Sequence, residues 1–78
     1  MAQPMVILYT RSGCHLCEEA HAVLLRHGVT PTLHDIDADS STLAEYDECV
    51  PVVEINGKVY FRGRVNEVLL RRILHRSG

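Results

Sequence analysis

The sequence predicts an α/β domain with the element order β-α-β-α-β-β-α, in which a four-stranded mixed sheet carries helices on both faces. Three features predict this class: an apolar run at residues 5–9 leads into a helical repeat, two β-rich runs flank Asn56-Gly57, and a second helical repeat closes the chain. A strand–helix–strand start favours a right-handed crossover and a parallel strand pair, to which the hairpin adds two more strands. Because 78 residues suffice for one domain only, we expect residues 1–78 to form a single unit.

The first strand is predicted at residues 5–9, which have no polar face and are typical of a strand buried on both sides. After a turn, apolar residues recur at helical spacing from Leu16 to His27, and Gly28 follows as a C-terminal stop. A second strand is predicted at residues 32–37, although its alternation of apolar and polar residues is imperfect.

A short second helix is predicted to run to about Tyr46. Residues 39–42 offer several N-caps, and Thr42 with Glu45 has the spacing of a capping box.

The last part of the chain predicts a hairpin and a closing helix. Asn56-Gly57 lies between the runs 52–55 and 58–61, and this dipeptide favours a type I′ turn, which needs positive φ at both central residues. After Gly63 the chain has apolar residues at helical spacing, which are Val65, Val68, Leu69, Leu70, Ile73 and Leu74.

Composition and charge exclude several classes of protein. Apolar residues make up 46% of the chain and charged residues 23%, which are globular proportions. No apolar run approaches the roughly 20 residues that cross a bilayer, so we expect no membrane association. The first residues lack the basic, then apolar, then small-residue order of a secretory signal, so we expect a cytoplasmic location. A net charge of -2 without interleaved aromatic and basic residues argues against nucleic-acid binding. We expect a monomer.

Cys14 and Cys17 lie where the first strand gives way to the first helix. The free N–H groups and the dipole at a helix start favour negative charge, so a thiol placed there ionises more readily, and the thiolate is the species that attacks disulfides. If Cys14 is the N-cap, its sulfur can accept a hydrogen bond from the backbone N–H of Cys17. The chain has three cysteines, and an odd number argues against a scaffold held together by disulfides. It favours thiols that stay reduced between reactions. We therefore predict a dithiol/disulfide redox site.

Two segments carry a resemblance to a known family. Residues 8–17, LYTRSGCHLC, and residues 61–65, FRGRV, resemble small bacterial glutaredoxin-like proteins, and the element order with Val50-Pro51 before the hairpin resembles the thioredoxin fold. The resemblance implies a thiol–disulfide oxidoreductase in which Cys14 is the nucleophile and Cys17 the resolving thiol. It also implies a cis peptide bond at Pro51, with the backbone of Val50 offering hydrogen bonds to a docked substrate.

The resemblance also implies residues that hold glutathione. In glutathione-using relatives a basic residue three positions before the first cysteine helps to hold glutathione, and Arg11 occupies that position. Further contacts come from a Gly-Gly pair followed by an acidic residue; here Gly63 matches the first glycine, Arg64 replaces the second and Glu67 stands for the acid.

The partners implied are a disulfide-containing protein or glutathione as substrate, and a reductase or glutathione as electron donor. No bound cofactor is expected, and glutathione would serve as a co-substrate. The chain departs from the usual glutaredoxin pattern by carrying His15-Leu16 between the cysteines instead of Pro-Tyr, and Cys49 instead of the threonine of Thr-Val-Pro.

Alternatives from other classes remain open. The cysteines could serve a metal or iron–sulfur binding module, and His21, four residues after Cys17, would then be a further ligand; a C-x-x-C pair alone is weak evidence, so we predict no metal site. The fold could also serve as an interaction module without redox turnover. Cys49 is either a small buried apolar residue or a third thiol near the site.

Overall fold

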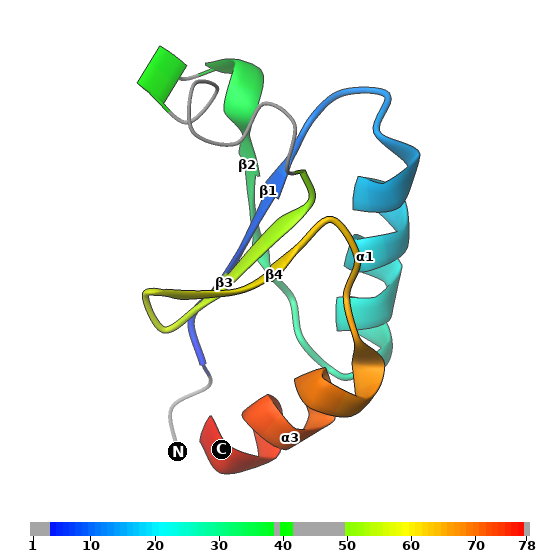
Figure 1. Cartoon of the computed structure of the whole chain (residues 1–78), viewed down its shortest axis with the longest axis vertical. Helices are drawn as coiled ribbons and strands as arrows, with labels where there is room; N and C mark the ends of the chain where they lie inside the picture. Colours follow the sequence, from blue (N-terminus) through cyan, green and yellow to red (C-terminus); the bar gives the residue numbers. More distant parts are fainter. Residues whose placement is uncertain (1–3, 39, 42–49, 78) are drawn as a thin grey trace.

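The computed structural model describes residues 4–38, 40–41 and 50–77 of the chain (Figure 1). Its elements follow the predicted order apart from the second helix, which falls on residues outside that description except for Ser40 and Ser41, both helical. The element bounds are β1 Val6–Thr10, α1 His15–Arg26, β2 Thr32–Asp35, a short 3₁₀ helix Ile36–Ala38, β3 Val52–Ile55, β4 Lys58–Arg62 and α3 Glu67–Ser77.

The four strands form one mixed sheet in the order β2-β1-β3-β4, which confirms the predicted four-stranded mixed sheet. The central strand β1 pairs in parallel with β2 and antiparallel with β3, and β3 pairs antiparallel with β4. Leu8 thus lies between Leu33 on β2 and Val53 on β3.

The larger hydrophobic core lies between the sheet and the helices α1 and α3. Leu8 on β1, Leu24 on α1 and Leu70 on α3 are fully buried in it. On the opposite face of the sheet, Ile36 of the 3₁₀ helix packs with Val52 in a second, smaller cluster. Both α1 and α3 therefore cover one face. The helix expected to cover the other lies mainly outside the described residues.

Two element boundaries differ from the prediction by two residues, and the others lie within one residue of it. The second strand ends at Asp35 instead of residue 37, because the Asp35 carboxylate accepts a hydrogen bond from the Asp37 backbone N–H at 2.9 Å and turns the chain into the 3₁₀ helix.

The closing helix begins later than the apolar spacing predicted. Asn66 is its N-cap, with its side-chain oxygen accepting from the Leu69 N–H at 3.1 Å. Val65 therefore precedes the helix and packs against the core together with Leu70, as in a hydrophobic staple. Val68 and Leu69, which the prediction placed on the apolar stripe, are 54% and 43% exposed.

The hairpin prediction is confirmed. Asn56 and Gly57 both have positive φ, at 52° and 85°, as a type I′ turn requires. In the described part of the chain, no helix has the length and apolar character needed to cross a membrane.

Candidate functional site

The loop between β1 and α1 places Cys14 at the start of a helix. Cys14 has an extended backbone conformation and is the N-cap of α1, and its sulfur accepts a hydrogen bond from the Cys17 backbone N–H at 3.1 Å. The Cys14 N–H in turn donates to the Arg11 carbonyl oxygen at 3.1 Å, which closes the turn before the helix. The Cys14 sulfur therefore occupies the position where a helix start stabilises negative charge.

Cys14 and Cys17 form a disulfide, with their Cα atoms 5.2 Å apart. The two residues differ in access to solvent: Cys17 is 3% exposed, whereas Cys14 is only partly buried. The structure thus contains the oxidised form of a dithiol pair with one accessible and one covered member.

Pro51 lies at the same edge of the sheet as the disulfide loop. Because Tyr9 pairs with Val52, Pro51 adjoins the end of β1 from which the loop departs. The Val50-Pro51 peptide bond is cis, as the resemblance implied, and Pro51 is buried.

Gly63, which follows β4, lies at the same edge of the sheet. Its N–H donates to the Pro51 carbonyl oxygen at 2.7 Å, and its φ of 88° is one that residues with a Cβ rarely adopt. The fold thereby brings the cysteine loop, Val50-Pro51 and the start of the Gly63-Arg64 segment to one edge of the sheet.

Arg11 is held by a partner that the sequence did not reveal. Its Nη2 atom lies 3.1 Å from Asp37 Oδ1, and its Nε atom lies 3.2 Å from Asp37 Oδ2. The parallel pairing of Thr10 with Asp35 brings Asp37 beside Arg11. The guanidinium expected to hold glutathione therefore already binds a carboxylate of the protein.

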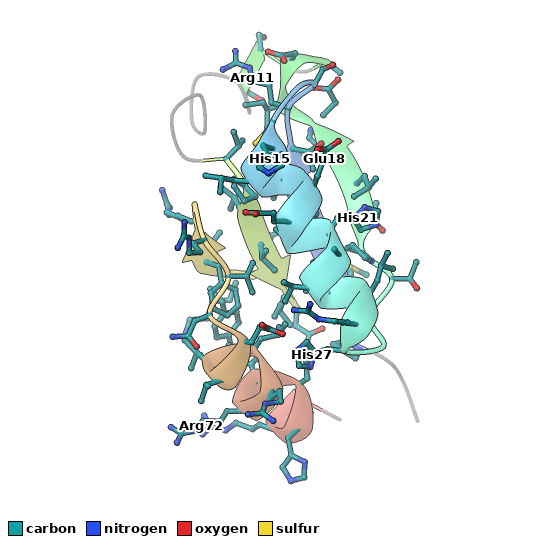
Figure 2. The ribbon with its side chains drawn as sticks, turned by 90° about the vertical axis from the view of Figure 1, so that its right-hand side faces the viewer. Arg11, His15, Glu18, His21, His27 and Arg72 are labelled. Atoms are coloured by element: carbon teal, nitrogen blue, oxygen red, sulfur yellow. A yellow bond between two sulfur atoms is a disulfide. The ribbon has the colours of Figure 1, made fainter. Side chains whose placement is uncertain are left out.

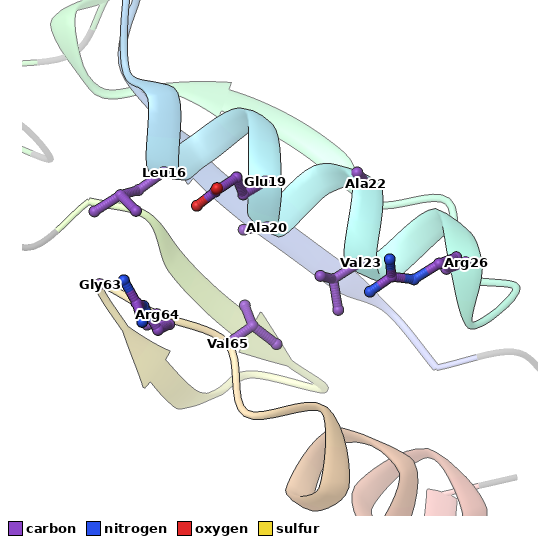
Figure 3. Close-up of a pocket in the computed structure, with 9 residues that line it drawn as sticks. All are labelled: Leu16, Glu19, Ala20, Ala22, Val23, Arg26, Gly63, Arg64 and Val65. Atoms are coloured by element: carbon purple, nitrogen blue, oxygen red, sulfur yellow. The ribbon is translucent and has the colours of Figure 1, made fainter.

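Arg64 lies on a cleft of about 420 Å³ between α1 and the loop that follows β4. Figure 3 shows Leu16 and Val23 on the α1 side of the cleft, with Gly63, Arg64 and Val65 across from them. The side chain of Arg64 is exposed. The cleft therefore extends from Leu16, which lies between the two cysteines, to the loop in which Gly63 is hydrogen-bonded to Pro51.

Glu67, expected to be the acidic contact for glutathione, binds the end of α1 instead. Its Oε1 atom accepts from Arg26 Nη2 at 2.8 Å and lies 3.0 Å from His27 Nε2. The hydrogen bond with His27, followed by that with Arg26, holds the pKa of Glu67 below its ordinary value. This carboxylate ties α3 to α1.

The other side of the disulfide, toward β2, opens onto a second hollow of about 220 Å³. Cys14, Cys17, Glu18, His21 and Leu33 are among the residues that line it. Metal binding was the one functional role that the sequence interpretation weighed for His21, against that of a surface or partly packed histidine. Its spacing of four residues from Cys17 was the signal that placed it on the same helical face as the dithiol.

His15, between the two cysteines, points to solvent. Its side chain is 84% exposed, and its ring nitrogens lie 3.8 Å from Glu18 Oε2 and 3.8 Å from Glu19 Oε1. Figure 2 shows His15 at the start of α1, and Glu18 and His21 further along the helix.

Two further sequence predictions concern a third thiol and a metal. Cys49 lies outside the described residues, so its role stays a prediction. Within residues 4–38, 40–41 and 50–77, no group of three or more His, Cys, Asp or Glu side chains is arranged to hold a metal ion.

Comparisons with known proteins agree with the fold described above. The family model described as "Glutaredoxin-like domain (DUF836)" matches residues 5–75. The solution NMR structure of protein Ne2328 from Nitrosomonas europaea is similar at 25% identity and a TM-score of 0.81, over 95% of this chain and 94% of that one. The glutaredoxin grx-1 from Archaeoglobus fulgidus is similar at 25% identity and a TM-score of 0.65, over 94% and 87%.

A third solved structure shows the fold alone. The thioredoxin-like protein BC3987 is 24% identical to this chain, with a TM-score of 0.68 over 88% of this chain and 99% of that one. The thioredoxin-like fold predicted from the sequence is therefore confirmed.

Proposed function

Since the chain belongs to the glutaredoxin-like domain family and carries a C-x-x-C pair that supports a thiol-redox role, we propose that it is a thiol–disulfide oxidoreductase. Its substrates are disulfides of proteins or mixed disulfides with glutathione. The observation that carries the proposal is the position of the Cys14 sulfur at the helix cap, hydrogen-bonded by the Cys17 N–H and within disulfide reach of Cys17.

The reaction proceeds by two exchanges. The Cys14 thiolate attacks one sulfur of the substrate disulfide, which releases the first substrate thiolate and leaves a mixed disulfide on Cys14. The Cys17 thiolate then attacks the Cys14 sulfur, which releases the second substrate thiolate and forms the Cys14–Cys17 bond. The substrate gains two electrons and the dithiol loses them, so a donor must return two electrons before the next cycle.

We propose glutathione or a separate reductase as that donor. Two features of the described residues support contacts with glutathione, which carries two carboxylates. Arg64 lies on the cleft beside Leu16, and the backbone of Val50 precedes the cis proline at the same edge as Cys14. At Arg11 a ligand carboxylate would compete with the Asp37 carboxylate that the guanidinium already binds.

The proposal is tested by a disulfide-reduction assay with glutathione or a thioredoxin reductase supplied separately as donor. We expect turnover by the wild-type protein, no turnover by Cys14→Ser, and loss of protein-disulfide reduction by Cys17→Ser. Turnover that survives Cys14→Ser would eliminate the proposed nucleophile.

The Cys17→Ser variant also separates two modes of chemistry. If this variant still removes glutathione from a mixed disulfide, the protein uses one thiol for that substrate and two for protein disulfides. An Arg64→Ala variant, compared with Arg62→Ala on the preceding strand, then measures whether Arg64 lowers the KM for glutathione.

A further inference from the structure

His21 lies beside the dithiol, but the two exchange steps above give it no part. It lines the hollow on the β2 side of the disulfide together with Cys14, Cys17 and Glu18. His21 is half-buried, and Figure 2 shows it on α1 beyond Glu18. The hollow has a volume of about 220 Å³, which is ample for water beside the imidazole.

The helix geometry directs His21 toward Cys17. Residues four apart lie on the same face of a helix with their Cβ atoms about 5–6 Å apart. Long side chains on a helix lean back toward its N-terminus, over the residue one turn earlier. His21 and Cys17 therefore lie one turn apart on the face of α1 that lines the hollow, where one water can bridge the imidazole and the Cys17 sulfur.

Cys17 needs a proton acceptor more than Cys14 does. The Cys14 sulfur sits at the cap, where the helix start stabilises the thiolate. Cys17 lies one turn inside the helix and is 3% exposed, and burial disfavours the charged form of a thiol. The second exchange requires the Cys17 thiolate, so its proton must go to a neighbouring base.

We propose that His21 is the proton acceptor for Cys17 in the second exchange, an inference that rests on the proposed function. The Cys17 S–H proton moves to a ring nitrogen of His21 as the Cys17 sulfur attacks the Cys14 sulfur. The bond between Cys14 and the substrate sulfur breaks, and the departing thiolate takes a proton from the imidazolium or from water. The electrons balance as in ordinary thiol–disulfide exchange, because one disulfide is broken and one is formed.

The other charged groups around the hollow suit this role less well. Glu18 is 81% exposed and lies 3.8 Å from His15, and Arg11 is a cation bound to Asp37. From β2 the hollow receives the apolar Leu33, while His34, one residue on, contacts the Tyr9 ring. An imidazole changes protonation between pH 5 and 8, which is the range in which a base for neutral-pH exchange must work.

The test follows both exchanges in one reaction. The reduced protein, in excess, is mixed with dithiobis(nitrobenzoate), whose coloured thiolate is released once when Cys14 attacks and again when Cys17 resolves the mixed disulfide. His21→Gln and His21→Ala are compared with Glu18→Gln, a variant of the neighbouring residue in the same hollow. The rates are measured from pH 5.5 to 8.5, with and without added imidazole.

We expect the second phase to slow by roughly 100-fold or more at pH 7 in both His21 variants, while the first phase keeps its rate. Imidazole should accelerate the second phase of His21→Ala, which a purely structural role would not produce. In both variants the second rate should rise steadily with pH, because without His21 the Cys17 proton passes to water or hydroxide.

Second-phase rates of both His21 variants within twofold of the wild-type rate at every pH would overturn the inference. The inference would also be overturned if Glu18→Gln alone slowed the second phase, or if imidazole had no effect on the second phase of His21→Ala. Absence of the first phase in the wild-type protein would instead overturn the proposed function, so the two failures are distinguishable.

Discussion

Arg11 and Asp37 form a two-point ion pair across the ends of the parallel strands β1 and β2, with Arg11 Nη2 3.1 Å from Asp37 Oδ1 and Nε 3.2 Å from Oδ2. The pair is more than one-third exposed at both side chains, at 37% and 41%. An exposed pair of this kind contributes about 0.2–1 kcal/mol to stability, so its larger effect concerns what else Arg11 can bind.

We predict that Asp37→Asn lowers the KM for glutathione by at most about fivefold and at least about 1.4-fold, the factors that correspond to the energy of such a pair. The reason is that the substitution removes a carboxylate that competes with glutathione for the Arg11 guanidinium. The measurement is the KM in a glutathione-coupled disulfide-reduction assay. If Asp37→Asn has the same effect in an Arg11→Ala background, the prediction is wrong.

Of the two thiols of the C-x-x-C pair, Cys14 should react first with iodoacetamide in the reduced protein. Cys14 caps the helix with its sulfur and is partly exposed, whereas Cys17 is buried. We expect Cys14 to be modified at a lower pH than free cysteine, whose thiol titrates near about 8.5. Mass mapping of the modified peptides over a pH series is the measurement, and modification of Cys17 ahead of Cys14 would contradict it.

Two neighbouring leucines of α1 should differ in their effect on stability. Leu24 is fully buried in the main core, while Leu25 is 50% exposed. We expect Leu24→Ala to lower the free energy of unfolding by about 2–5 kcal/mol, and Leu25→Ala by no more than about 0.5 kcal/mol. Urea denaturation of the two variants measures the difference. Equal losses would show that Leu24 does not anchor α1 on the sheet.

Glu67→Gln should lower the melting temperature in a pH-dependent way. The hydrogen bond with His27, and after it the bond with Arg26, lowers the pKa of Glu67 in the folded protein. A carboxyl with a lowered folded pKa stabilises the fold above its unfolded pKa, and this contribution is lost as the pH falls through the folded pKa.

We therefore expect Glu67→Gln to melt below the wild-type protein at pH 7, with the two melting temperatures converging at pH values well below the ordinary 4.5. Thermal unfolding followed by circular dichroism over a pH series tests this, and Glu19→Gln, whose carboxylate lies near His15 on the same helix, is the control. A difference in Tm that is constant with pH would refute the role of the carboxylate.

Features encoded by short-range chemistry were predictable from the sequence. Asn56-Gly57 requires a turn with positive φ, and a cysteine at the strand–helix junction can cap the helix, so the hairpin and the Cys14 hydrogen bond followed from local patterns. The cis bond at Pro51 required the family resemblance, because about 5–6% of X-Pro bonds in folded proteins are cis.

Features that depend on long-range pairing were not predictable. Asp37 reaches Arg11 only because β1 and β2 pair in parallel with Thr10 opposite Asp35. The start of α3 was misjudged for a different reason: Val65 fits the helical spacing, but Asn66 caps the helix and leaves Val65 outside it. The contact of Glu67 with the end of α1 likewise depends on how the two helices meet.

The unequal burial of the two cysteines fixes which one a large partner can touch. A folded protein has no route to Cys17 through the surface, so any covalent adduct with such a partner forms on Cys14. A chain carrying Cys17→Ser would lack the thiol that breaks this mixed disulfide, so the adduct would persist. Protein substrates could then be isolated from a cell extract as adducts of Cys14 and identified.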